Sequence, residues 1–534
     1  MAIQSKGGSL IPHLERTADG AARLIVDGQP YIVLGGELHN SSSSSRAYME
    51  PIWPRLAGMQ LNTVLAAVSW ELIEPLEGRF DFTIVDELIA DARSAGLRLI
   101  LLWFGSWKNS FSTYTPGWVK TDLQRFPRMK LRTGQVVGTI SCFSREACEA
   151  DARAFAALMR HLRETDGDHH TVIMVQVENE AGLLGSPRDY SDEAECRFGT
   201  AVPEELAQGI AARGYCLLPE LDGPWAAAGK RQSGTWSEMF GAAAEEVFMA
   251  WHIARYVNEV AAAGREEYAL PLFANAWTVQ HEGELPGQYP SGGPVSRMLD
   301  VWQCAAPAIE LLAPDIYLPD FPAECASYTR SGNLLFIPEA RNDRWAAANV
   351  FYAIGKHHAI GFSPFGIDSV DADSEPVIGN AVQSEAMKRA GVDVGRMLGR
   401  SYRLLKEMMP ILTRCYGTDR MTGVLQFGPN VQALELGGYV LRITFSRPVL
   451  DDADFPGAGI LIAESDREYI VAGHGFSVDF LAKPGDLPHV EFLAIEEGVY
   501  REGAWVPGRR LNGDEYGVRL GAEPGVIRVS VFSY

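Results

Sequence analysis

Basic residues are scarce relative to acidic ones in this sequence. Its 534 residues include 47 Lys and Arg against 68 Asp and Glu, which leaves a formal net charge of −21. A surface of that sign repels a phosphate backbone, and no basic stripe along the sequence offsets the repulsion. The composition therefore argues against nucleic acid as a partner.

Long apolar runs are also missing. Stretches such as Leu99–Gly105 fall far short of the roughly 20 residues that cross a bilayer, and the first residues lack the apolar segment of a signal peptide. We expect no membrane association and a cytoplasmic location for the chain as given. A periplasmic or secreted location would apply if a signal peptide had been removed.

Cysteine is infrequent and dispersed. The seven cysteines form no close CxxC pair, and an odd, scattered set argues against a disulfide framework and a structural zinc site. The pairs His169-His170 and His357-His358 lack the spacing and the converging carboxylates of a metal site. We therefore expect neither a metal nor an organic cofactor.

The sequence does contain a regular alternation of short apolar runs with amphipathic segments. Apolar residues make up 47% of the chain, enough for a sizeable core. The runs have little polar alternation, as is typical of parallel strands that are buried on both faces. The expected strands are Tyr31–Leu38, Asn62–Trp70, Arg98–Trp107, Val172–Glu180, Leu270–Trp277, Leu311–Leu318, Leu334–Glu339 and Gly361–Ile367.

A helix or a segment of helical length follows each strand, and eight such units predict an α/β fold of the (β/α)8 TIM-barrel type. An open doubly wound sheet also alternates, but Gly35-Gly36 does not continue into GxGxxG. The expected helices are Ile84–Ala95, Arg145–Arg163, Ser237–Ala263, Arg344–His358 and Ser384–Met409. The long connection between Ala181 and Trp236 is expected to be a functional lid or substrate wall, with Trp225 and Trp236 as candidate wall residues.

After Pro410 the pattern changes to short alternating strands that Gly, Pro and Asp interrupt. This is typical of an antiparallel β-sandwich or small barrel. We therefore expect an N-terminal extension (1–29), a catalytic barrel (30–413) and a smaller all-β domain (414–534). The last of these is expected to pack on the barrel or form a homo-oligomer contact, with glycan binding as the alternative.

Catalytic residues of such barrels lie at the C-terminal ends of the strands. The predicted strands end in carboxylates, amides and indoles, a combination that suits a sugar. Two carboxylates, Glu180 and Glu339, each take the last position of an apolar strand. A pair of carboxyls about 5–5.5 Å apart, one protonated and one ionised, cleaves a glycosidic bond with retention. The alternative is that each glutamate only caps a helix N-terminus.

Several segments resemble glycoside hydrolase family 35, the β-galactosidases of clan A, over roughly residues 25–413. Val172–Glu180, which ends in Gln-Val-Glu-Asn-Glu, is similar to the acid/base strand and is the most specific match. Asn62–Trp70 with the Glu-Pro and Gly-Arg-Phe motifs after it is similar to the second strand, and Phe336–Glu339 to the nucleophile strand.

The resemblance implies a role for four residues. Glu180 would be the general acid/base and Glu339 the nucleophile. Asn179 would bind the 2-hydroxyl of the sugar, and Tyr317 would lie against Glu339. The further candidates for substrate binding, taken from the strand ends, are His39, Trp70, Glu71, Trp107 and Trp277.

The chain also departs from the family pattern. It has Trp70-Glu71 where the family has Trp-Asn. It has Phe104-Gly-Ser-Trp107 where the family carries a glutamate that binds the galactose hydroxyls. We expect Glu71 to contact the −1 sugar or the base of that subsite, the alternative being an ion pair with Lys108 or Arg46 at the barrel rim. With these departures the chain resembles a divergent bacterial branch of the family that has its own C-terminal β domain. The members of this branch include enzymes that act on galactosylated xyloglucan.

The sequence thus predicts a retaining exo-β-glycosidase, first a β-galactosidase that acts on oligosaccharides or on plant polysaccharide side chains such as those of xyloglucan. A β-glucosyl hydrolase or transglycosylase on β-glucan oligosaccharides is the alternative within the same chemistry. A non-catalytic carbohydrate-binding barrel is the alternative from another class, and the presence of both carboxylates weighs against it.

Overall fold

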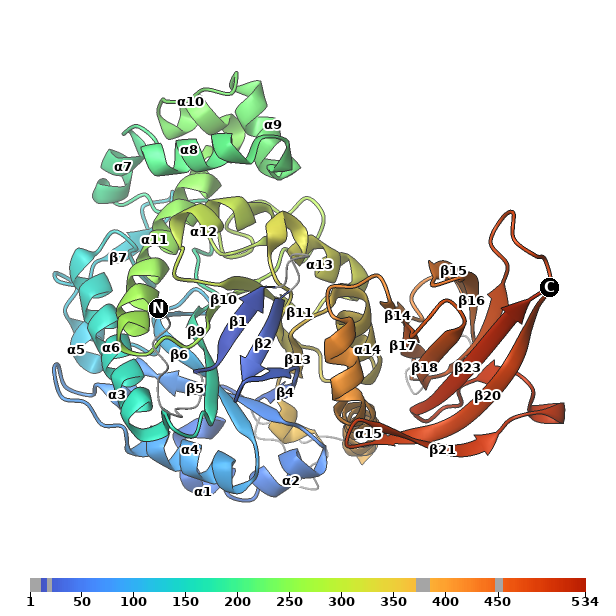
Figure 1. The fold of residues 1–534 in the computed structure, drawn as a ribbon. Coiled ribbons are helices and arrows are strands. Elements are labelled where there is room, and N and C mark those ends of the chain that lie inside the picture. The colour runs from blue at the N-terminus through green and yellow to red at the C-terminus, as the bar shows by residue number, and fades with distance from the viewer. Residues whose placement is uncertain (1–10, 17–21, 371–384, 447–454) are drawn as a thin grey trace, which may run out of the picture.

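The computed structural model of the chain describes residues 11–16, 22–370, 385–446 and 455–534, so parts of the predicted N-terminal extension lie outside it. Its centre is a closed barrel of eight parallel strands (Figure 1). The barrel strands, in chain order, are β4 (Val33–Glu37), β5 (Thr63–Ser69), β6 (Arg98–Lys108), β9 (Val172–Asn179), β10 (Leu272–Trp277), β11 (Leu311–Ile316), β12 (Ile337–Ala340) and β13 (Gly361–Pro364). All eight expected strands are present, and the TIM-barrel prediction is confirmed.

Helices surround the barrel because their apolar stripes cover the outer face of the strands. In α6 the N-cap Ser144 accepts a hydrogen bond from the backbone N–H of Ala147, and the buried side of the helix is a row of Ala, Leu, Phe and Met. The principal outer helices are α4 (Thr83–Ser94), α6 (Arg145–Asp166), α11 (Ala244–Glu267), α12 (Leu299–Ala305), α13 (Phe321–Tyr328), α14 (Ala346–His357) and α15 (Glu385–Cys415).

A small antiparallel sheet closes the N-terminal end of the barrel. It consists of β1 (His13–Arg16), β2 (Ala22–Val26) and β3 (Gln29–Tyr31), and it crosses the barrel centre in Figure 1. Leu24 and Val26 of β2 pack with Leu65, Ile100 and other apolar residues from inside the barrel in one buried cluster. This end is therefore a dry core.

The connection between Ala181 and Trp236 is largely helical from Asp192 onward, whereas the sequence suggested a long loop. Its helices are α7 (Asp192–Phe198), α8 (Glu204–Arg213), α9 (Pro219–Ala227) and α10 (Trp236–Phe240). They pack on α11 and α12 and project from the side of the barrel (Figure 1). Trp236 lies edge-on to Phe248 and is buried, as is Trp225, so neither indole forms a substrate wall.

Two antiparallel sheets make up the C-terminal part and enclose their own apolar core, as predicted for an all-β region. Their strands are β14 (Met421–Leu425), β15 (Val431–Leu436), β16 (Tyr439–Phe445), β17 (Ala458–Ala463), β18 (Glu468–His474), β19 (Phe476–Leu481), β20 (Val490–Arg501), β21 (Ala504–Arg510), β22 (Val518–Arg519) and β23 (Gly525–Ser533). The strands expected from the alternation did not include β21, most of whose side chains are exposed, or β22, which has only two residues.

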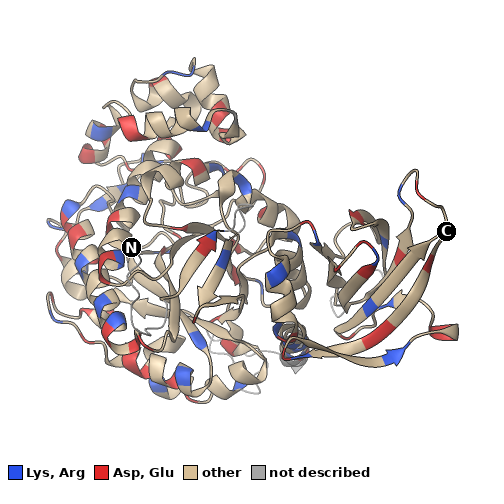
Figure 2. Ribbon diagram, viewed as in Figure 1, with Lys and Arg blue, Asp and Glu red and all other residues tan. Residues whose placement is uncertain are grey.

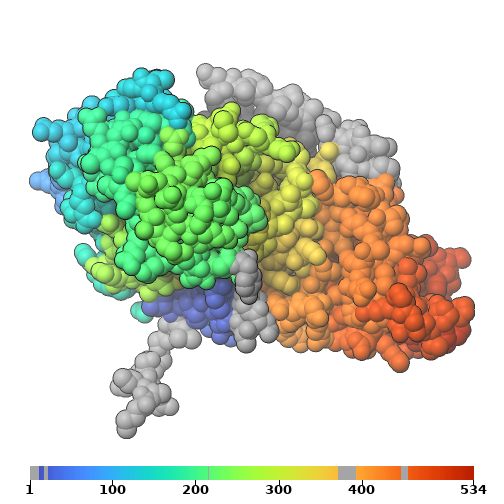
Figure 3. Space-filling model, turned by 90° about the horizontal axis from the view of Figure 1, so that it is seen from above, coloured from blue at the N-terminus to red at the C-terminus, as the bar shows by residue number. Residues whose placement is uncertain are grey.

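The C-terminal sheets pack directly on the barrel, one of the arrangements expected from the sequence. A Cβ atom on Gly355 of α14 would lie 2.8 Å from the Cα of Gly423 of β14, so the two backbones need glycine to come this close. In Figure 3 the green helical insert lies at the front of the view, and the C-terminal part, in orange and red, continues the body of the molecule at one side.

Charge on the outside is mixed in sign. Lys and Arg alternate with Asp and Glu over the outer helices in Figure 2, and many are paired, as Arg125 is with Glu77 at 2.8 Å. Within the described residues, no helix combines the length and the apolar character that a membrane span requires.

Candidate active site

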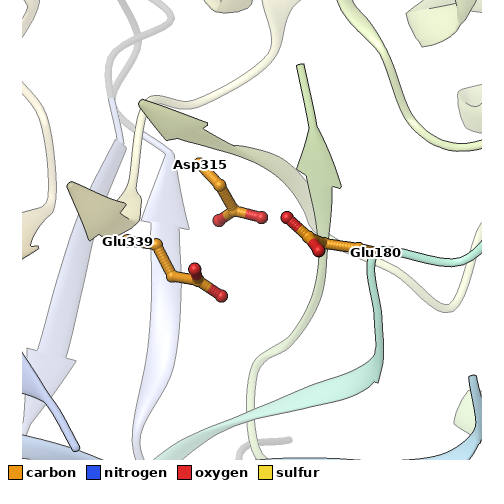
Figure 4. Close-up of side chains that lie close together, drawn as sticks. All are labelled: Glu180, Asp315 and Glu339. Atoms are coloured by element: carbon orange, nitrogen blue, oxygen red, sulfur yellow. The ribbon is translucent and has the colours of Figure 1, made fainter. Parts of the chain in front are cut away.

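Three carboxyl groups converge at the C-terminal end of the barrel. Glu180, Asp315 and Glu339 each place an oxygen within 4.8 Å of an oxygen of the other two, and all three residues are buried. Figure 4 shows the three side chains pointing toward one another from their separate strands. The sequence had singled out two of these residues, and the structure brings them together.

Strand register explains the convergence. Asp315 and Glu339 are paired across the parallel strands β11 and β12, so their side chains leave the sheet side by side. Glu178 and Glu180 have φ of 64° and 46°, in the left-handed region that costs energy for residues with a side chain. Because these angles break the alternation of an extended strand, consecutive Asn179 and Glu180 both reach the site.

Hydrogen bonds fix the Glu339 carboxylate. The Tyr317 hydroxyl donates to its Oε2 at 2.7 Å, and the amides of Asn179 and Asn275 approach its Oε1 at 3.4 and 3.5 Å. Asn275 also donates to Asp315 Oδ2 at 2.8 Å and accepts from the backbone N–H of Glu180 at 3.0 Å. This one amide therefore links all three carboxyl residues.

The environment separates the protonation states of the carboxyls. Burial raises the pKa of Glu180 to about 7, and the neighbouring charge of Glu339 adds to the effect. Burial and the same charge hold the pKa of Asp315 well above its usual range. A carboxyl that keeps its proton near neutral pH is the group that general-acid catalysis requires.

Lys108 supplies positive charge to this acidic cluster. Burial opposes its charge, but Glu339, Glu180 and Glu37 outweigh burial and raise its pKa, so Lys108 stays an ammonium group. Its Nζ donates to Asn179 Oδ1 at 3.0 Å. Three carboxyls at this spacing also suit a divalent cation, but here a lysine holds the neighbouring positive charge.

A bulge in β6 brings Lys108 into the site. The register between β6 and β9 shifts after Trp103, and the bulge is held from behind by Asp151 of α6, which accepts from Ser106 Oγ at 2.6 Å and from the Trp103 indole at 2.9 Å. Burial raises the pKa of Glu178 well above its usual range, and the neighbouring Asp151 carboxyl adds to the effect. A Cβ on Gly105 would lie 2.6 Å from Glu178 Oε1, so glycine leaves the room for this acid pair.

Three residues predicted to bind substrate lie outside the cluster. Trp70 is fully buried and its indole N–H donates to Glu74 at 2.8 Å, so it packs in the core rather than lining the site. Glu71 forms an ion pair with Lys120 at 2.7 Å, a rim pairing with a partner other than those expected. Trp107 is buried behind β6 against Tyr256.

Two other predicted residues lie at the margin of the site. Trp277 is half-buried at the end of β10 and pairs in register with Asp315. The His39 ring lies tilted against Phe365, which in turn contacts Tyr317 edge-on. The backbone N–H of His39 donates to Asp368 at 3.0 Å. Asp368 thereby ties the loop after β4 to the loop after β13.

Four residues of the site were absent from the predicted set: Glu37, Lys108, Asn275 and Asp315. All four lie at strand ends in the sequence, which was the available signal. What the sequence did not indicate is which of many strand-end polar groups point inward, since that depends on the bulge in β6 and on the register of the strands.

The family model described as "Beta-galactosidase", glycoside hydrolase family 42, matches residues 43–229. The chain is related to the β-galactosidases. The resemblance is thereby confirmed at this level, while the narrower assignment to family 35 stays a prediction. A second model, described as "Domain of unknown function (DUF5597)", matches residues 398–521, which span the end of α15 and most of the C-terminal strands.

Individual relatives carry the same description. The "Beta-galactosidase" of Xanthomonas manihotis is 27% identical over 175 residues, 32% of this chain and 27% of that protein. The human "Beta-galactosidase-1-like protein 3" is 28% identical over 192 residues, 35% of this chain and 27% of that protein. The chain thus matches about a quarter of the length of these relatives. The solved β-galactosidase of the psychrophilic Marinomonas ef1 aligns with 71% of this chain and 60% of its own at 14% identity and a TM-score of 0.46.

Proposed function

We propose that the chain is a retaining exo-β-glycosidase, first a β-galactosidase, with Glu339 as nucleophile and Glu180 as general acid/base. The observation that carries this proposal is the separation of at most 4.8 Å between their nearest oxygens. Retaining enzymes hold the two carboxyls about 5–5.5 Å apart, whereas inverting enzymes leave about 6.5–9.5 Å for a water.

The proposed reaction has two displacements. In the first, a Glu339 oxygen bonds to the anomeric carbon while the bond to the leaving oxygen breaks, and Glu180 gives that oxygen its proton. In the second, Glu180 takes a proton from water, and the resulting oxygen displaces Glu339 and restores the β configuration. Tyr317 and Asn275 hold the Glu339 carboxylate for attack.

The acceptor in the second displacement decides between hydrolysis and transglycosylation, because a sugar hydroxyl takes the place of water in the latter. Both reactions need the same two carboxyls, so the transglycosylase remains the alternative within this chemistry. A non-catalytic carbohydrate-binding barrel would have no use for a protonated Glu180 next to Glu339.

A substrate screen tests the proposal. Aryl β-galactoside, β-glucoside and β-xyloside are offered to the purified chain, followed by xyloglucan and β-glucan oligosaccharides, with Glu339→Gln as the matched variant. We expect turnover of the galactoside first, terminal galactose released from xyloglucan side chains, and none of this with the variant. Turnover of no glycoside, or equal turnover by the variant, would contradict the proposal.

A further inference from the structure

The last residue of β4, Glu37, has a completely buried side chain. Val33 of the same strand belongs to the apolar core inside the barrel, and the alternation of side chains puts Glu37 on that same inner side. Within the described part of the chain, neither of its carboxyl oxygens has a hydrogen-bond partner. A buried polar group without a partner costs free energy, and such a group in a native structure calls for a ligand or another functional reason.

The charged groups that act on Glu37 are those of the active site. They come from four other strands or strand ends: Lys108, Glu180, Asp315 and Glu339. Glu37 therefore lies close enough to the catalytic carboxyls to interact with their charge, although the proposed reaction does not use it.

The order of strands around the barrel separates two groups of side chains. Glu180, Asn275, Asp315 and Glu339 come from the consecutive strands β9 to β12, whereas Glu37 and Lys108 come from β4 and β6 on the other arc. In a pyranose, C4 lies across the ring from the anomeric carbon. If the anomeric carbon lay between Glu180 and Glu339, the C3 and C4 side of the ring would have this second arc as its protein partner.

We propose that Glu37 and Lys108 bind the hydroxyls on C3 and C4 of the −1 sugar and thereby set which sugar is accepted, an inference that rests on the proposed function. The two groups are complementary, because an ammonium donates hydrogen bonds and a carboxyl accepts them. Among the described residues, Lys108 Nζ donates one N–H to Asn179, which leaves two N–H groups for a ligand. The substrate class is a neutral β-glycoside with both hydroxyls free.

Glu37 and Lys108 would take over the binding of sugar hydroxyls from the family's glutamate, which is absent from the segment Phe104-Gly-Ser-Trp107. They would also take the role that the sequence suggested for Glu71, whose carboxylate is occupied by Lys120. Specificity is then set at the ends of β4 and β6 rather than on the loop after β5.

Removal of one hydroxyl in the substrate, combined with removal of one side chain, tests the inference. The substrates are 4-nitrophenyl β-galactopyranoside and its 3-deoxy and 4-deoxy analogues. Wild type should lose about 100-fold or more in kcat/KM on each analogue, because a buried partner is left unpaired. Glu37→Ala should lose about 100-fold on the parent glycoside and almost nothing further on one of the two analogues.

Two further variants separate binding from folding. Glu37→Gln keeps the shape and breaks no hydrogen bond within the described residues, so its Tm should equal or exceed that of wild type while the hydroxyl discrimination weakens. Glu246→Gln alters another buried carboxyl that lies on α11 and accepts from Tyr289. This control should discriminate among the three substrates as wild type does.

The outcomes distinguish the inference from the proposed function. If Glu37→Ala and Glu37→Gln keep the full wild-type penalty on both analogues, Glu37 does not bind these hydroxyls and the inference fails alone. If wild type turns over neither this glycoside nor its C4 epimer, the proposed function fails and takes the inference with it. The inference would also be overturned if Glu246→Gln lost the discrimination among the three substrates to the same extent as the Glu37 variants. The loss of a buried carboxyl, and not of a contact with the sugar, would then explain the effect.

Discussion

The two ends of the barrel are built from the same eight strands but follow opposite rules. At the N-terminal end, Leu24, Leu65 and Ile100 fill the space with apolar side chains that have no exposed surface. At the C-terminal end, Glu180, Asp315 and Glu339 are nearly as buried, yet they are ionisable and close enough to repel one another. The apolar side chains of the first end stabilise the fold, whereas the buried carboxyls of the second end destabilise it, as is common at functional sites.

The largest effect should come from the nucleophile. Glu339→Ala should lower kcat by about 10⁴-fold or more, because its two hydrogen-bond partners replace the carboxylate poorly. Burial raises the pKa of the Tyr317 phenol, which keeps its proton, and the Asn275 amide is a weak nucleophile. Azide should restore turnover and yield an α-glycosyl azide, which NMR identifies. Circular dichroism should show an intact fold. Hydrolysis at the wild-type rate would remove Glu339 from this role.

The second effect depends on the leaving group. Glu180→Ala should lose about 10²–10⁴-fold on an oligosaccharide, whose departing oxygen needs a proton, and far less in the glycosylation step on a dinitrophenyl glycoside. Pre-steady-state kinetics on both substrates measures the difference. Equal losses on the two substrates would contradict the acid role.

The pH profile should reflect the raised pKa of Glu180. Because the acid must be protonated, kcat/KM on an oligosaccharide should fall as the pH rises through about 7, the value to which burial and Glu339 raise the pKa of this carboxyl. In Glu180→Gln the basic limb at this pH should disappear. A wild-type profile that stays flat from pH 6 to 9 would contradict the assignment.

The smallest effects are on stability, where the two ends should respond in opposite directions. Leu24→Ala should lower the free energy of unfolding by about 2–5 kcal/mol and leave kcat of the folded enzyme within a few-fold of wild type. Glu180→Gln should raise stability at pH 8 by up to about 3 kcal/mol, because a carboxyl with a raised pKa costs the folded state more as the pH rises from its usual value to about 7.

Denaturant unfolding at pH 5 and pH 8 measures both changes. The gain from Glu180→Gln should appear at pH 8 and nearly vanish at pH 5, whereas the loss from Leu24→Ala should be similar at both. A Glu180→Gln variant that is less stable than wild type at pH 8 would erase the contrast between the two ends.

The sequence predicted the dry parts of the molecule better than the charged ones. The eight barrel strands are apolar runs whose burial on both faces leaves a plain signal, and they lie where expected. The pair Glu180 and Glu339 was predicted because each ends such a strand. Trp70 was misplaced since nothing in the sequence shows that Glu74, four residues on, accepts its indole N–H.

Other parts could not be predicted because they depend on contacts between distant segments. Lys108 enters the site only through the β6 bulge that Asp151 of α6 supports. The helices between Asp192 and Phe240 have short, weakly amphipathic patterns and are held by packing on α11 and α12, so the segment reads as a loop in isolation.

The most direct test of the central claim is to trap the glycosyl-enzyme. The purified chain is incubated with 2,4-dinitrophenyl 2-deoxy-2-fluoro-β-galactoside, whose fluorine slows the second displacement, and is then digested for peptide mass spectrometry. The account predicts one added fluorosugar per chain, carried by Glu339, and its loss when an acceptor sugar is supplied. A label on Glu180 or Asp315, or continued turnover of this glycoside with no labelled peptide, would contradict it.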